Sequence, residues 1–129
     1  MRSVRAEYLL EFKGGETLLL EGDARGLIAL ADALEALARG NVAGVQLHST
    51  PFLSCDHEFL ASREDRDIGL ASSDGRFLWR RTAEGWLETV DKIRALLEHG
   101  SGHQYLDGPR DELQVMVSTG EGYERLHVQ

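Results

Sequence analysis

The sequence has one cysteine and two prolines among 129 residues, and no long uninterrupted run of apolar residues. A single cysteine excludes a disulfide within the chain. A membrane-spanning helix needs about 20 consecutive apolar residues, and residues 1–12 mix charged and apolar side chains where a secretory leader has an apolar stretch. The sequence therefore predicts a protein without a membrane segment, located in a bacterial-type cytoplasm.

Basic residues are also comparatively few, because 14 Lys and Arg stand against 22 Asp and Glu, which gives a net charge of -8. Such a chain repels the phosphate backbone, so nucleic acid is not an expected partner. A basic protein surface is a plausible one, since excess negative charge steers association with positive charge. The length fits one domain, which we expect to cover residues 1–129.

The spacing of apolar residues predicts both strands and helices. Apolar and polar residues alternate over 4–12, which indicates a strand, and two glycines then provide a turn into a second strand at 17–21. From 24 to 39 apolar residues recur every three or four positions between Asp23, a possible N-cap, and Gly40, which predicts an amphipathic helix. The same pattern predicts a second helix after Thr82 that ends before Gly100. Shorter strands are expected at 45–48, 68–72, 77–80, 113–118 and 123–128.

These elements favour an α+β fold. Two strand–helix–strand stretches must each bury an apolar stripe, and the short connections suit hairpins. We therefore predict two helices packed on one face of a largely antiparallel sheet. The expected core residues are Leu30, Leu34, Leu37, Val90, Ile93 and Leu97.

A shift of 59 residues superposes the two helical segments, with Asp23 on Thr82 and Gly26 on Gly85. This match suggests a β-α-β-β unit present twice, over 16–72 and 76–118. Two unrelated amphipathic helices with similar caps would also share several of these identities. A glycine in the first helical turn costs about 1 kcal/mol relative to alanine, so its repetition predicts a close approach of each helix to the sheet; ordinary tolerance near a helix end is the alternative.

Cys55 and His57 are the nearest pair to a reactive site, because in an extended segment they lie on one face and an imidazole can take the thiol proton. No motif of a nucleophilic cysteine surrounds Cys55, and a lone cysteine is usually a small core residue. We expect that Cys55 is not a catalytic nucleophile. The five histidines lack the spacing of a zinc site, so no metal or other cofactor is expected.

His103, Tyr105 and Asp107 alternate along the chain, so on a strand they would share one face. An imidazole, a phenol and a carboxylate together could orient a ligand or perform acid/base chemistry. The competing interpretation is that the two rings are buried against a helix. These three residues define the predicted site of an alternative function, a small-molecule-binding domain or small enzyme.

Arginines and tryptophans gather between residues 76 and 86. Such a basic and aromatic set could stack on a nucleic-acid base, but the acidic balance of the chain opposes this. We expect the tryptophans in the core and the arginines on the solvent side. The residues concerned are Arg76, Arg80, Arg81, Trp79 and Trp86.

The chain resembles the small α+β immunity proteins of bacterial polymorphic-toxin systems. The resemblance lies in the helix that follows a hairpin, the compact length, the acidic balance, and the tract from His103 to Asp107 with the later tract from Leu113 to Glu121. It implies a non-catalytic inhibitor that binds and occludes a cognate toxin, many of which are basic nucleases. An oligomeric structural domain is a third possibility.

A basic partner would be held by acidic side chains outside the predicted core. The alternative role of these residues is solubility. The candidates, expected in exposed loops, are Glu58, Glu64, Asp65, Asp67, Asp111, Glu112 and Glu121.

Overall fold

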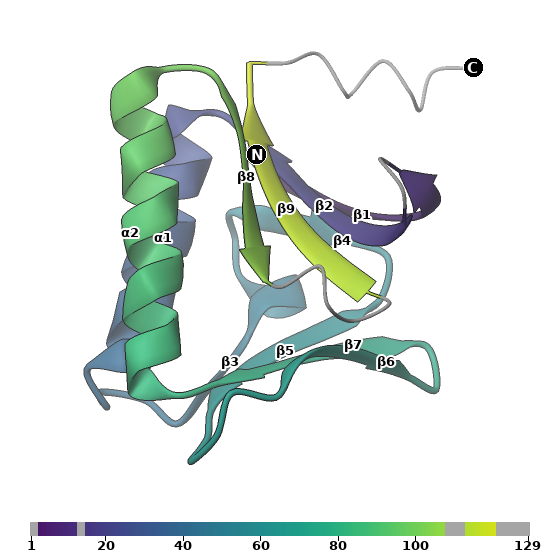
Figure 1. Cartoon of the computed structure of the whole chain (residues 1–129), viewed down its shortest axis with the longest axis vertical. Coiled ribbons are helices and arrows are strands. Elements are labelled where there is room, and N and C mark those ends of the chain that lie inside the picture. The colour runs from purple at the N-terminus through teal and green to yellow at the C-terminus, as the bar shows by residue number, and fades with distance from the viewer. Residues whose placement is uncertain (1–2, 13–14, 108–112, 121–129) are drawn as a thin grey trace.

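The computed structural model describes residues 3–12, 15–107 and 113–120, and confirms the α+β class. In this part of the chain two helices, α1 (Ala24–Ala38) and α2 (Ala83–His99), lie side by side along one side of two sheets (Figure 1). Neither described helix combines the length and the apolar character needed to cross a membrane.

The helices begin where the sequence signals place them. The Asp23 side chain accepts the N–H of Gly26 at 2.8 Å, and the Thr82 hydroxyl accepts the N–H of Gly85 at 3.0 Å. Each cap satisfies an N–H group that has no partner within its own helix. Sequence and structure therefore agree at both helix starts.

The nine described strands form two sheets. Sheet A has the order β4-β1-β2-β9-β8, and sheet B has the order β3-β5-β7-β6. A short 3-10 turn, η1 (Leu47–Ser49), follows β3, so the strand expected at 45–48 ends early. The strand bounds are β1 (Val4–Phe12), β2 (Gly15–Gly22), β3 (Gly44–Gln46), β4 (Leu53–Cys55), β5 (Glu58–Arg63), β6 (Gly69–Ser73), β7 (Arg76–Arg81), β8 (Gly102–Asp107) and β9 (Leu113–Thr119). The strand expected at 123–128 lies outside the described residues.

Both sheets are mixed, which differs from the single, largely antiparallel sheet that we expected. The pairs β1–β4, β2–β9 and β5–β7 are parallel, whereas β1–β2, β3–β5, β6–β7 and β8–β9 are antiparallel. Alternation along a strand shows which of its faces is buried, but it does not identify the neighbouring strand. The parallel pairs join strands that are not consecutive, so local patterns could not reveal them.

One core joins all the layers. Trp79 and Trp86 are fully buried in it, as expected, with ring centroids 4.9 Å apart, and the indole N–H of Trp86 donates to the Ser62 carbonyl at 2.9 Å. This bond ties α2 to sheet B. Of the predicted core residues, Leu97 is partly buried and packs against the core, and the others are buried: Leu30, Leu34, Leu37, Val90 and Ile93.

The chain passes twice through the same order of pairings: an antiparallel hairpin, a helix, and two strands that pair with each other. Each helix carries the chain from one sheet to the other. Sheet A therefore combines β1 and β2 with β9 and β8, and sheet B combines β6 and β7 with β5 and β3; β4 is an addition to sheet A. These matching elements run from Val4 to Arg63 and from Gly69 to Thr119. Their bounds differ from those of the repeat predicted from the sequence, which were 16–72 and 76–118. A duplication of the chain stays a prediction.

Both repeated glycines are sites of close approach, but at Gly26 the neighbour is the segment before β1 rather than the sheet that we expected, whereas at Gly85 the neighbours are the segment before β6 and Arg81 of β7. A Cβ added at Gly26 would lie 2.6 Å from the Ser3 Cβ and 2.7 Å from the Ser3 carbonyl oxygen. A Cβ added at Gly85 would collide with the Asp67 carboxylate. Ser3 precedes β1 and Asp67 lies shortly before β6, so both helices start against matching positions.

Candidate functional site

The structure brings together two of the three residues of the predicted ligand site on β8. His103 and Tyr105 lie opposite Ser118 and Met116, and their rings meet edge to face with centroids 6.2 Å apart. A register shift after Tyr105 places Asp107 opposite Val115, so the pairing no longer advances by two residues on both strands. The alternation expected for three residues is therefore interrupted by an irregularity in the strand, and the Asp107 side chain lies outside the described part of the structure.

A groove of about 480 Å³ lies between the C-terminal end of α2 and β8. Both His99 and His103 line it, so two imidazoles and several backbone groups face the same space. A metal would need more ligands than this pair. Among the described residues, no three His, Cys, Asp or Glu side chains lie close enough to hold a metal ion together.

Cys55 ends β4 and is half-buried. Burial raises the pKa of the Cys55 thiol, although a hydrogen bond with the backbone of His57 acts in the opposite direction. The His57 ring lies edge-on to Phe77, at a centroid distance of 5.5 Å. Because the thiolate is the nucleophilic form, the raised pKa disfavours nucleophilic chemistry at Cys55; that Cys55 is not a catalytic nucleophile stays a prediction.

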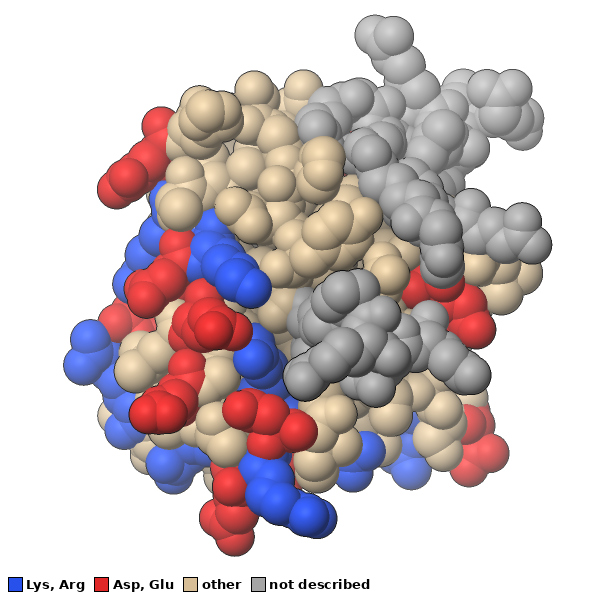
Figure 2. Space-filling model, viewed as in Figure 1, with Lys and Arg blue, Asp and Glu red and all other residues tan. Residues whose placement is uncertain are grey.

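The predicted acidic contacts do not form one patch in the described structure. Glu58 is not in a loop but begins β5, where it lies 3.8 Å from the Arg76 guanidinium, whereas Glu64 and Asp65 follow the other end of β5. Asp67 accepts the N–H of Thr82 at 2.8 Å and so anchors the start of α2. On the face seen in Figure 2, acidic and basic side chains alternate over α2 and sheet B. Asp111, Glu112 and Glu121 lie outside the described residues.

A second groove, of about 340 Å³, lies on the outer face of sheet B. No labelled helix or strand lies below this face in Figure 1. The strand register places one apolar row across it, made by Leu60, Leu78 and Ala71, with Gln46 at the β3 end. All three apolar residues are only partly buried, and the row forms the floor of an open surface.

The next row on this face consists of small residues and one arginine. Gly44, Ser62, Arg80 and Gly69 lie opposite one another across the four strands. The glycines have no side chain, so Arg80 lies on a nearly flat surface beside the apolar row. The Nε of Arg80 is buried and has no hydrogen-bond partner in the part of the chain that the structure describes. This row adds a cationic group to the groove.

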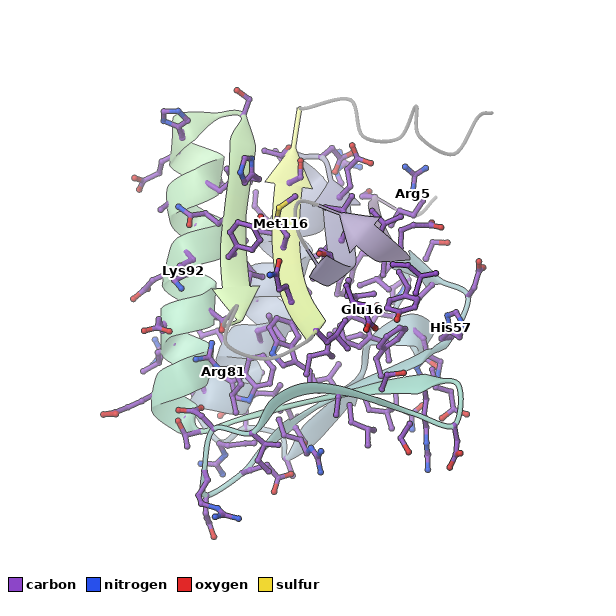
Figure 3. The ribbon with its side chains drawn as sticks, turned by 45° about the vertical axis from the view of Figure 1, so that its right-hand side comes forward. Arg5, Glu16, His57, Arg81, Lys92 and Met116 are labelled. Atoms are coloured by element: carbon purple, nitrogen blue, oxygen red, sulfur yellow. The ribbon has the colours of Figure 1, made fainter. Side chains whose placement is uncertain are left out.

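The matching position in sheet A shows what is unusual about this face. Leu19 and Met116 lie opposite each other on β2 and β9, as Leu78 and Leu60 do on β7 and β5, and they also alternate with core residues. Yet Leu19 and Met116 are 1% and 0% exposed; Figure 3 labels Met116. The outward pair of sheet A is thus shielded from water, whereas the equivalent pair of sheet B is partly open to it.

Sequence reasoning placed Arg80 correctly on the solvent side but missed the groove, because the groove needs the neighbours of β7 to be known. It was wrong about Arg81, which is only 9% exposed. The Arg81 guanidinium donates to the Thr89 hydroxyl and, at 3.2 Å, to the Leu106 carbonyl, between α2 and the end of β8 (Figure 3). Strict alternation continued from Phe77 and Trp79 would have placed Arg81 on the inner face.

Comparison of this chain with protein-family models, with curated proteins and with solved structures finds no match.

Proposed function

We propose that this chain is a non-catalytic protein-binding module and that its partner docks on the outer face of sheet B. The observation that carries the proposal is the partly exposed apolar row of Leu60, Leu78 and Ala71, beside Arg80, whose Nε has no partner in the described structure. Partly open apolar side chains that are contiguous across several strands are typical of interaction surfaces. An apolar centre with an arginine at its margin is also the usual composition of a protein interface.

The shape of the groove supports a protein partner over a small molecule. Ligand pockets enclose most of the ligand surface, whereas this groove lies open on a sheet face that ends at the short edge strand β3. An extended or flat partner surface can contact the whole row at once. The partner class that we favour is a toxin inhibited by an immunity-type protein, with the net charge of -8 steering a basic partner toward the chain.

The test compares three proteins as bait against an extract of the source organism: the wild-type chain, Leu78→Asp, and Leu87→Asp. Leu87 is a matched control because it is 43% exposed, lies on α2 and does not line the groove of sheet B. We expect a protein that the wild type and Leu87→Asp retain and that Leu78→Asp loses, forming a complex of defined stoichiometry by light scattering. Thermal unfolding of Leu78→Asp is the control that it remains folded.

Retention that is unchanged in Leu78→Asp would overturn the proposed surface. Retention of no protein by the wild type, or turnover of a metabolite by the purified chain, would overturn the binding function itself. If Leu87→Asp loses the partner and Leu78→Asp keeps it, the interface lies on α2.

The groove lined by His99 and His103 supports a second candidate function, the binding of a small polar ligand. Screening a metabolite set by thermal shift tests it. A ligand that stabilises the wild type and not His103→Ala, at an unchanged melting temperature of the free variant, would favour this function.

A further inference from the structure

Arg80 differs from Arg5, Arg76 and Arg81 in having no anionic partner among the residues that the structure describes. The guanidinium of Arg5 lies 3.0 Å from Glu21, that of Arg76 lies 3.8 Å from Glu58, and that of Arg81 lies 3.3 Å from Glu88. Arg80 has no ion pair with a described carboxylate, and its buried Nε has no acceptor among the described residues. The groove therefore contains one donor group that the described residues leave unsatisfied.

A buried donor without an acceptor is costly, on the order of 1–3 kcal/mol. An arginine presents its Nε–H and one Nη–H in parallel, and this pair matches the two oxygens of a carboxylate. The Nε–H is closed to solvent in the free chain, so a carboxylate that enters the groove and pairs with the charge would satisfy it only once the Arg80 side chain turns toward that carboxylate. The donor pattern of Arg80 selects a planar, bidentate anion.

The apolar row sets a second requirement. Leu78 and Arg80 are two residues apart on β7 and lie on the same face, so their rows are about 7 Å apart. An extended partner segment that runs along the strands has the same repeat, because its own residues i and i+2 point to one side. The segment can then place an apolar side chain on Leu60 and Leu78 while a carboxylate two residues away reaches Arg80.

We propose that the groove of sheet B binds an extended segment of a partner protein in which an Asp or Glu lies two residues from an apolar residue. The carboxylate pairs with Arg80, and the apolar side chain packs on Leu60 and Leu78. This inference rests on the proposed function and specifies the partner's recognition sequence. It is compatible with a partner that is basic overall, since the contact with Arg80 is local whereas steering depends on the whole charge.

The experiment is a selection from a displayed library of random 12-residue peptides on the full chain. With the wild type as target we expect enrichment of sequences with an acidic residue two positions from an apolar one. With Arg80→Gln the acidic preference should disappear while the apolar preference stays. Leu87→Asp serves as control and should select like the wild type.

One selected peptide then gives the magnitude. Replacing its acidic residue by the corresponding amide should weaken binding to the wild type about tenfold, as expected for a partly exposed charge-assisted pair, and should leave binding to Arg80→Gln nearly unchanged. The Arg80 Nε–H resonance should shift when the acidic peptide is added. Sodium acetate alone should not shift it at comparable concentration, because it lacks the apolar contact.

The outcomes separate the two proposals. Apolar peptides without an acidic preference, lost in Leu78→Asp, would refute the role of Arg80 and retain the binding surface. Peptides that bind Leu78→Asp and the wild type equally would refute both. Equal loss of affinity in the wild type and in Arg80→Gln on amide replacement would also overturn the pairing with Arg80.

Discussion

Gly26→Ala should destabilise the protein even though alanine is the better helix former. The new methyl group would lie 2.6–2.7 Å from the Cβ, carbonyl carbon and carbonyl oxygen of Ser3. These atoms cannot easily yield, because the Ser3 N–H donates to the Phe52 carbonyl at 3.0 Å and the Ser3 carbonyl accepts the Asp23 N–H at 3.2 Å. Either α1 shifts away from Ser3 or these hydrogen bonds lengthen.

Two terms of opposite sign decide the magnitude. Overpacking against backbone costs about 1–3 kcal/mol, and the upper end applies here because the neighbour is held on both sides. The gain in helix propensity is about 1 kcal/mol. The expected net loss is about 2 kcal/mol in the free energy of unfolding, which lowers the melting temperature by roughly 5–10 °C for a chain of this size.

Urea unfolding followed by circular dichroism measures this loss. Arg25 is the matched control position, because it is exposed in the same helical turn and its side chain bonds to no residue that the structure describes. Arg25→Ala should be more stable than Arg25→Gly by the propensity term alone. Ser3→Gly should rescue only part of the loss in Gly26→Ala, since the carbonyl remains. A Gly26→Ala protein at least as stable as the wild type would show that the segment before β1 moves freely and would refute the reasoning.

Three further predictions concern single side chains. Burial raises the pKa of the Cys55 thiol, so iodoacetamide at pH 7.5 should modify Cys55 more slowly than free glutathione; faster modification would contradict this assignment. Arg94 and Arg39 lower the pKa of Glu35 to about 2 from its ordinary value of 4.5, so these pairs stabilise the fold above pH 4.5 and lose this effect as the pH falls toward 2. Carbon NMR titration should show Glu35 ionised at pH 3.5 in the wild type and protonated to a larger fraction in Arg94→Gln, where Arg39 alone still lowers the pKa. Trp86→Phe removes the donor to the Ser62 carbonyl and should cost about 2–3 kcal/mol in urea unfolding; a loss below about 0.5 kcal/mol would show that the bond contributes little.

The sequence was most informative where structure depends on neighbours along the chain. Asp23 and Thr82 cap the helices as expected, and the strand over 4–12 was placed correctly, because caps and alternation are local properties. The second sheet and the parallel pairs depend on which strands meet, and local patterns do not contain that information. The strand β5 was missed for another reason, since its own alternation of Phe59 and Ala61 with outward residues is a local signal.

The candidate site follows the same division. Alternation along β7 placed Arg80 outside, but the open row needs Leu60 from β5 and Ala71 from β6 beside it. The ring contact between His103 and Tyr105 was expected from alternation, whereas the register shift before Asp107 was not. No local pattern indicated that Asp67, a predicted partner contact, also accepts the Thr82 N–H at the start of α2.

The exchange of strands between the two halves makes them inseparable as folding units. Sheet A is completed by the last strands of the second half, and sheet B by the later strands of the first half. A break in the chain near residue 66 would leave β2 without β9 and β7 without β5, so each fragment would lack half of both sheets. The parallel pairs form only after long loops close, which predicts slow folding at high contact order. Two separately expressed fragments should remain unfolded alone and recover the helical and sheet signals only when mixed.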